Sequence, residues 1–460
     1  MDKTMNIDGF FQKFITKSMG CTEPAAIGLT TSIGINALEG KIPSWLNNEL
    51  LNTAHLIDKN INLNSLSEII VRLDKDLYRN ALKVIIPNTG GIMGCDYAAA
   101  LGLLCDPENK MELFKDLTAD EVKLGKTLVD KKKIKIIPTY EWNDLHIETE
   151  IVTDNHHIII HTVGDHSNIS YIMIDGRIIL EKKLIEKKSP YLDELIKLNL
   201  FDLVSIAKNL PDKSRKIIQD AIDTNYKAFK SARKEFENNN QKSIGLSIKE
   251  LTDNEYLPSN YINSAKIKVA CAVEGRMAGF PLEIMTCANS GNMGLISTIP
   301  LIEISKRFSM GGDKLVEAIG LTHLLANFVS KYSGNLSALC GCIIKAGIGL
   351  AAGITYYLLE PEKPKQLQIK AISRAINSMI ANITGIICDG ANKTCALKSI
   401  TAVDSAIISS LLALDNQEDF SSLGIVNKDP LVSIKNIGKI SASMKNTDEI
   451  IIKEILDKNL

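Results

Sequence analysis

Short runs of β-branched residues occur in one part of this chain, between Ile69 and Leu184, and this restriction limits the folds it can adopt. The runs are EIIVRL, KVIIP, KIKIIP, IETEIV, HHIIIHTV, SYIMI and RIIL, and several alternate with a period of two between Asn, Asp or Gly residues. Such runs predict strands. From about Ser189 onward, Ala-, Leu-, Ile- and Ser-rich stretches with Gly punctuation predict helices instead.

The change in texture predicts an α+β fold with two domains. Residues 1–64 and 190–460 are expected to form a mainly helical domain, and residues 65–189 an inserted α/β sheet domain. A helix is predicted between Gly20 and Gly40, entered through Thr22 and Pro24, because Thr caps helices, Pro suits the first turn and Gly permits a left-handed exit.

Composition indicates what kind of protein this chain forms and which partners it is expected to bind. The chain has 460 residues, of which 45% are hydrophobic and 23% charged, so it can bury a large core. Its 53 basic and 54 acidic residues nearly balance, without a long basic block, so nucleic acid is not an expected partner. Nine cysteines in this length fit a reduced protein, and the polar start MDKTMNIDGFFQKF is unlike a signal peptide. We therefore expect a cytoplasmic location.

One apolar stretch raises the question of a membrane span. Residues 342–359, CIIKAGIGLAAGITYYLL, carry a single charge, Lys345, and are nearly long enough to cross a bilayer. The flanks lack the charge asymmetry and aromatic belt that anchor such helices. A buried core helix is the prediction, and no membrane partner is expected.

The cysteines separate by their surroundings. Cys95, Cys105 and Cys271 lie in ordinary apolar contexts, typical of small buried hydrophobes, and Cys287 fits either class. Cys388 and Cys395 flank a polar, Gly-containing loop in ICDGANKTCALK, which lets two thiolates turn toward one point, and Cys340 and Cys342 form LSALCGC. Three such cysteines would leave one iron of a cubane cluster open as a Lewis acid. The spacing alone does not decide whether these cysteines are cluster ligands or inert core residues.

Seven motifs in order along the chain resemble one family. They are GCTEPAA, PNTGG, VGDHSN, EGRMAG, NSGNMG, LSALC and GIICDGANKTCALK. This set resembles the L-cysteine desulfidases, also grouped as an uncharacterised family and similar to the iron–sulfur-dependent L-serine dehydratases. The resemblance implies a lyase with a [4Fe-4S] cluster and without pyridoxal phosphate, which converts L-cysteine and water to pyruvate, ammonia and hydrogen sulfide. It also implies that the helical domain is the catalytic one, with cluster ligands Cys340, Cys388 and Cys395 and with Cys342 as a bystander.

The resemblance leaves other functions to be weighed. L-serine is the alternative substrate, because oxygen and sulfur leaving groups can use the same open iron. A non-catalytic iron–sulfur sensor is the alternative from another class. The substrate is a small amino acid in the enzymatic reading, and a homodimer is one expectation for the assembly, on which the sequence is silent.

The chemistry of β-elimination suggests further site residues. Cys21, which corresponds to the cysteine of the family's GCTEP motif, is the candidate base, because a helix N-terminus lowers a thiol pKa; a buried, inert thiol is the other interpretation. Arg276 is a candidate for the substrate carboxylate, although it could equally form a surface ion pair. The remaining candidates for substrate binding are backbone N–H groups and polar side chains of Thr22, Glu23, Asn289, Ser290, Gly291 and Asn292.

Overall fold

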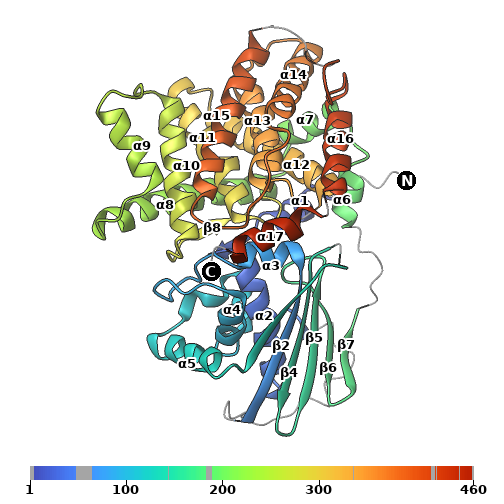
Figure 1. The fold of residues 1–460 in the computed structure, drawn as a ribbon. Coiled ribbons are helices and arrows are strands. Elements are labelled where there is room, and N and C mark those ends of the chain that lie inside the picture. Colours follow the sequence, from blue (N-terminus) through green and yellow to red (C-terminus); the bar gives the residue numbers. More distant parts are fainter. Residues whose placement is uncertain are drawn as a thin grey trace.

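The computed structural model describes residues 5–47, 65–142, 144–182, 189–334, 336–415, 420, 422–444 and 446–457. Figure 1 shows a large helical part above a twisted sheet, with the last helix at the junction between them. The predicted α+β class with mainly helical content is confirmed. Both predicted domain boundaries adjoin stretches outside the described residues, 48–64 and 183–188, and they stay a prediction.

The main sheet has six strands in the order β3-β2-β4-β5-β6-β7. β2 and β3 pair in parallel, and every other neighbouring pair in this order is antiparallel. Alternation of buried and half-buried residues along β4 and β5 shows that one face is covered, as period two requires. The strand bounds are β2 (Leu66–Asp74), β3 (Ile134–Thr139), β4 (His146–Thr153), β5 (His157–Val163), β6 (Ile169–Ile174) and β7 (Arg177–Glu181).

The connection between β2 and β3 is a long helical crossover. One run within it, KVIIP, does not form a strand; Ile85 makes only an isolated bridge with Met93. The predicted helix after the PNTGGIMG loop is present as α4. The crossover contains α3 (Lys75–Ala81), α4 (Cys95–Gly102), the 3₁₀ helix η3 (Pro107–Asp116) and α5 (Ala119–Asp130).

The predicted helix after Gly20 is α2 (Thr22–Leu38), and it packs under the sheet. Its residues from Ala25 to Leu38 share a hydrophobic core with the strands, whereas we expected residues 1–64 to join the helical core. The physical reason is that α2 is apolar all round, so it can lie between the sheet and α4. Gly102 meets Gly28 there, because a Cβ on Gly102 would lie 2.3 Å from the Gly28 carbonyl oxygen.

The helical part surrounds α13 (Ile348–Leu358), which packs against α11, α12, α14 and α15. α13 continues the π-helix η4 (Cys342–Gly347), so the apolar stretch 342–359 is a buried core helix, as predicted. The other helices of this part are α1 (Ile7–Phe14), α6 (Pro190–Leu195), α7 (Leu200–Lys208), α8 (Asp212–Asn238), α9 (Ile244–Asp253), α10 (Tyr261–Met277), α11 (Gly291–Phe308), α12 (Gly312–Ser333), α14 (Lys365–Ile383), α15 (Cys395–Leu414), α16 (Pro430–Ser443) and α17 (Thr447–Asp457).

One described helix, α15, is long and apolar enough to cross a membrane, and half of its most apolar window is buried. It packs against α10, α13 and α14, so its composition is that of a core helix. No membrane partner was expected, and a cytoplasmic location stays a prediction.

Two short contacts bring distant segments to one place. β1 (Lys17–Met19) pairs antiparallel with β8 (Glu283–Met285), which sets Cys21 and the start of α2 beside the loop before α11. At the other end of the chain, α17 packs on α3, and Figure 1 shows the two helices between the helical part and the sheet. These contacts place several polar loops around one cavity.

Candidate active site

A cavity at the junction of the helical part and the sheet holds nearly all the predicted site residues. It has about 860 Å³ of empty space, including its open mouth. Every predicted site residue except Gly291 lines it, namely Cys21, Thr22, Glu23, Arg276, Asn289, Ser290, Asn292, Cys340, Cys388 and Cys395. Cys342 lines it too, so the structure does not separate Cys340 from Cys342 by position.

The two cysteine-bearing segments pair through a short antiparallel bridge. Leu339 lies opposite Ile387, the Cys340 N–H donates to the Ile386 carbonyl (2.9 Å), and the Cys388 N–H donates to the Ala338 carbonyl (2.7 Å). Opposite and next-but-one residues of paired strands share a face, so Cys340 and Cys388 point to the same side. Cys395 begins α15, five residues after the left-handed Gly390.

Three cations act on these thiols. The charge of Lys398 and a hydrogen bond with Cys342 lower the pKa of Cys340, while the same hydrogen bond and burial raise the pKa of Cys342. Burial raises the pKa of Cys388 against the opposing charge of Arg79, and burial raises that of Cys395 to about 12. Lys345, on η4, is buried, and this desolvation lowers its pKa to about 8.

The donor set fits an iron–sulfur cluster. Four cysteines line the cavity, and the positively charged side chains of Arg79, Lys345 and Lys398 line it with them. Within the described ranges, no three His, Cys, Asp or Glu side chains converge on a point where a single ion would bind. Cluster thiolates bind different irons and are spread wider than the ligands of one ion. Cys340, Cys388 and Cys395 would hold such a group.

Cys21 and Glu23 also line the cavity. Cys21 is the N-cap of α2, and its thiol donates to Glu23 Oε2 (2.8 Å). Burial and the charge of Glu23 raise the pKa of Cys21 well above its ordinary value. The reasoning that the helix N-terminus lowers this pKa is therefore wrong, since desolvation outweighs the helix dipole here.

Glu23 behaves in the opposite way. Burial alone would raise its pKa, but the charge of His166 and hydrogen bonds from Cys21 and from Asn80 (Nδ2 to Oε1, 3.0 Å) lower it. The Nε2 atom of His166 is buried and has no hydrogen-bond partner within the described part of the chain. This part of the cavity thus holds a carboxylate that accepts a hydrogen bond from a thiol, next to a histidine.

Arg276 is a buried cation. Its side chain is 2% exposed, its Nη1 donates to Asn292 Oδ1 (2.9 Å), and its Nε has no partner in the described residues. No carboxylate of the described residues forms an ion pair with it, so the surface ion pair considered from sequence is not formed. Gly291 leaves space behind this group, because a Cβ there would lie 2.5 Å from Nε.

A strained turn presents the loop before α11. Cys287 and Ser290 exchange backbone hydrogen bonds of 3.0 and 2.9 Å, and Ala288 and Asn289 between them both adopt positive φ, 47° and 61°. Two adjacent non-Gly residues in this region mark strain of the kind found at ligand sites. Asn289 Nδ2 also donates to Asp165 (3.2 Å), which joins the turn to the sheet.

Seven polar or charged residues that line the cavity, cysteines apart, were not among the predicted site residues: Arg79, Asn80, Asp165, His166, Ser337, Lys345 and Lys398. Lys345 carried a signal, as the single charge in an apolar run. Asp165 lies in the GDHSN motif, which was used for the resemblance alone. Arg79 and Asn80 come from the short α3 in the middle of the strand region, and no spacing linked them to the cysteines.

The sequence of this chain is similar to the sequences of known proteins. The family model described as serine dehydratase alpha chain matches residues 108–453. A UPF0597 protein of Elusimicrobium minutum is 30% identical over 447 residues, 96% of each chain. The UPF0597 protein of Caldanaerobacter subterraneus is 31% identical over 96% of each chain. That of Clostridium botulinum strain Okra is also 31% identical, over 92% of this chain and 90% of the relative. The resemblance drawn from the motifs is confirmed, and the chain belongs to the serine dehydratase alpha chain family.

Proposed function

We propose that this protein is an L-cysteine desulfidase, an iron–sulfur-dependent lyase that forms pyruvate, ammonia and hydrogen sulfide from L-cysteine and water. The family supports the coarser statement, a lyase of the serine dehydratase kind with an iron–sulfur cofactor. The observation that carries the proposal is that four cysteines and a buried arginine line one cavity, and that this arginine has no carboxylate partner among the described residues.

A [4Fe-4S] cluster held by Cys340, Cys388 and Cys395 would supply one iron with a free position, a Lewis acid for the leaving sulfur or oxygen. Arg276 is a buried cation without a carboxylate partner among the described residues, which is costly, and a substrate carboxylate would supply that partner. Asn289, Ser290 and Asn292 line the same cavity as Arg276, and Thr22 lies next to Glu23 in the sequence.

Cys21 and Glu23 together can remove the α proton. The Cys21 thiol passes its proton to the Glu23 carboxylate and accepts the proton from the substrate α carbon, so Glu23 is the net acceptor in this step. The electron pair of the broken C–H bond forms the α–β double bond, and the substrate sulfur leaves as hydrosulfide with the pair of the C–S bond. The proton held by Glu23 returns to the hydrosulfide to give hydrogen sulfide, which restores the carboxylate. The aminoacrylate that remains tautomerises and takes up water to give pyruvate and ammonia.

The test is the purification of the protein without oxygen, followed by measurement of iron, acid-labile sulfide and the products from L-cysteine and L-serine. We expect iron in the protein, and sulfide and pyruvate from L-cysteine at a higher kcat/KM than pyruvate from L-serine. A reversed preference would make L-serine the substrate of the same lyase. Iron without pyruvate from any amino acid would favour the sensor, and full activity without iron would refute the cluster.

A further inference from the structure

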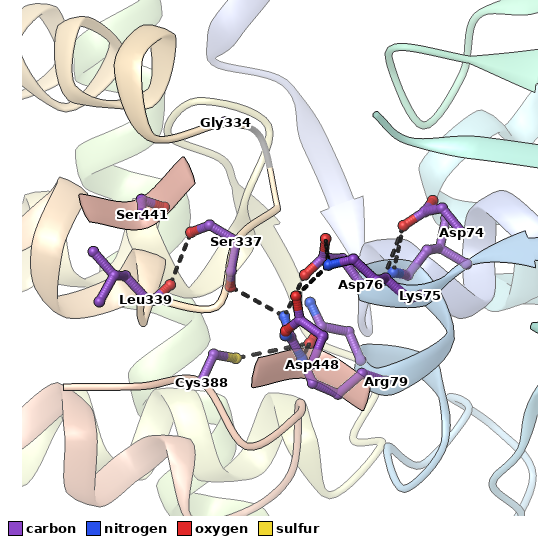
Figure 2. Close-up of polar contacts among 12 residues, drawn as sticks. Asp74, Lys75, Asp76, Arg79, Gly334, Ser337, Leu339, Cys388, Ser441 and Asp448 are labelled. Carbon is purple, nitrogen blue, oxygen red and sulfur yellow. Dashed lines mark hydrogen bonds and ion pairs between the residues drawn. The ribbon is translucent and has the colours of Figure 1, made fainter. Parts of the chain in front are cut away.

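A carboxylate in the last helix of the chain lies buried at the edge of the active site. Asp448, in the first turn of α17, is 1% exposed, and its side chain forms ion pairs with Lys75 and Arg79 of α3 (Figure 2). Arg79 is fully buried and Lys75 nearly so. Removing one partner of a buried ion pair leaves a charge that is costly to bury, so each of these three groups depends on the others.

α3 contacts both cysteine-bearing segments. Arg79 Nη2 donates to the Ser337 carbonyl oxygen (3.1 Å), three residues before Cys340, and the Cys388 sulfur lies 3.7 Å from Asn80 Oδ1. Figure 2 shows Arg79 and Asp448 side by side, next to the segments of Ser337 and Cys388. A shift of α3 would therefore move the wall that holds Cys340 and Cys388.

α17 and α3 also close on the loop between Cys388 and Cys395. A Cβ on Gly390 would lie 2.9 Å from the Arg79 carbonyl oxygen and 3.7 Å from Ile455 Cδ1, so both helices pack against this loop. Gly390 has a φ of 93°, which favours glycine in any case. The packing makes α17 part of the support of the cysteine loop.

The charges of the buried ion pairs around Arg79 balance. Lys75 and Arg79 face Asp448 and Asp76, and Asp76 lies 3.1 Å from Arg79. Arg79 acts electrostatically on Cys388. Removal of the Asp448 charge would leave one excess positive charge next to a proposed cluster ligand.

We propose that Asp448 is a positioning residue for the cluster: it holds Arg79 and α3 against the segments of Cys340 and Cys388 and offsets the charge of Arg79. The inference rests on the proposed function in taking these cysteines as ligands. It adds that the end of the chain, far from the motifs, controls the geometry and the charge of the ligand wall.

The experiment compares Asp448→Asn with Glu454→Gln, which removes the same charge from an exposed position of the same helix. Hydrogen exchange is measured in the cluster-free proteins over residues 336–342 and 386–395, whose amides include those of Cys340 and Cys388. We expect exchange roughly tenfold faster in Asp448→Asn and unchanged in Glu454→Gln. Wild-type exchange in Asp448→Asn would overturn the proposal, whether or not the protein binds iron.

A second readout separates the charge from the packing. In the loaded enzyme, Asp448→Asn should raise the midpoint potential of the cluster, because excess positive charge favours the reduced form, and Glu454→Gln should not. If Asp448→Asn does not fold, as judged by circular dichroism, Asp448→Glu keeps the charge and displaces the carboxylate. It should exchange faster at an unchanged potential, and wild-type exchange in it would refute the positioning role. A wild-type protein without iron would contradict the proposed function alone.

Discussion

The thiol of Cys21 donates its proton toward the carboxylate of Glu23, with Sγ and Oε2 2.8 Å apart. Burial and the carboxylate charge keep the sulfur protonated, and hydrogen bonds keep the carboxylate ionised. These opposite pKa shifts keep the proton on sulfur in this state, so the transfer to Glu23 that we propose takes place only when substrate is bound.

Replacement of Glu23 by Gln should lower kcat by about 10²- to 10⁴-fold, the range for loss of a general base, because the amide cannot accept the thiol proton. KM should change little, since the side chain is not the carboxylate-binding group. Glu283→Gln, on the exposed end of β8, is the matched control and should keep wild-type kcat. Steady-state pyruvate formation measures both constants, and an unchanged kcat in Glu23→Gln would remove Glu23 from the mechanism.

The ligand set predicts which cysteines retain iron. Cys340→Ser and Cys388→Ser should lose most of their iron and the associated visible absorption, because serine is a poor ligand for the cluster. Cys342→Ser should keep both, and so should Cys105→Ser, which lies in the separate core of the sheet. Anaerobic iron analysis after purification gives the answer. Retention in Cys340→Ser with loss in Cys342→Ser would exchange the roles of these two residues.

Arg276→Gln should raise KM for the amino acid roughly 10- to 100-fold, the factor expected for loss of a charge-assisted hydrogen bond to the carboxylate. Gly291→Ala should act in the same direction, because the added Cβ displaces the guanidinium. Arg233→Gln removes a half-exposed arginine paired with Glu237 and should leave KM unchanged. The proposed role of Arg276 does not survive if its variant has the wild-type KM.

The burial of His323 predicts that the free energy of unfolding decreases in acid. Both ring nitrogens are buried without a hydrogen-bond partner in the described residues, and desolvation lowers the pKa to about 3. The unfolded chain takes up a proton below its ordinary pKa of 6.5, so the stability from the neutral ring is complete above that pH and is lost as the pH falls toward 3. The loss should reach about 2 kcal/mol near pH 5.

His323→Gln should flatten that part of the pH dependence. Urea unfolding at a series of pH values measures the free energy of unfolding for the two proteins. A slope in the variant equal to that of the wild type between pH 7 and 5 would show that other groups cause the acid sensitivity.

The sequence predicted the strands and helices where period and capping were clear. Six of the seven β-branched runs became strands of the sheet, and α2 begins at Thr22, although its N-cap is Cys21 and not Thr22 as predicted. The run KVIIP failed because the loop that follows it returns to it in a single bridge at Ile85. The position of α2 under the sheet could not be predicted, since an all-round apolar helix fits either core.

The motifs predicted most of the cavity wall but not its support. Cys340, Cys388 and Arg276 stand in recognisable motifs, so the sequence indicated them. Arg79 depends on pairing with Asp448, 369 positions further along the chain, and such long-range ion pairs leave no local pattern. The raised pKa of Cys21 was also hidden, because burial is a property of the folded chain.

The contact of α17 with α3 has a consequence for biosynthesis. The cavity draws on segments that begin at Cys21 and extend to Lys398, and the carboxylate that neutralises its arginine follows at Asp448. A chain truncated after Lys398 would contain every segment that lines the cavity and would still leave Arg79 without the carboxylate of Asp448. The thiols of the site are thus synthesised before the charge that supports them.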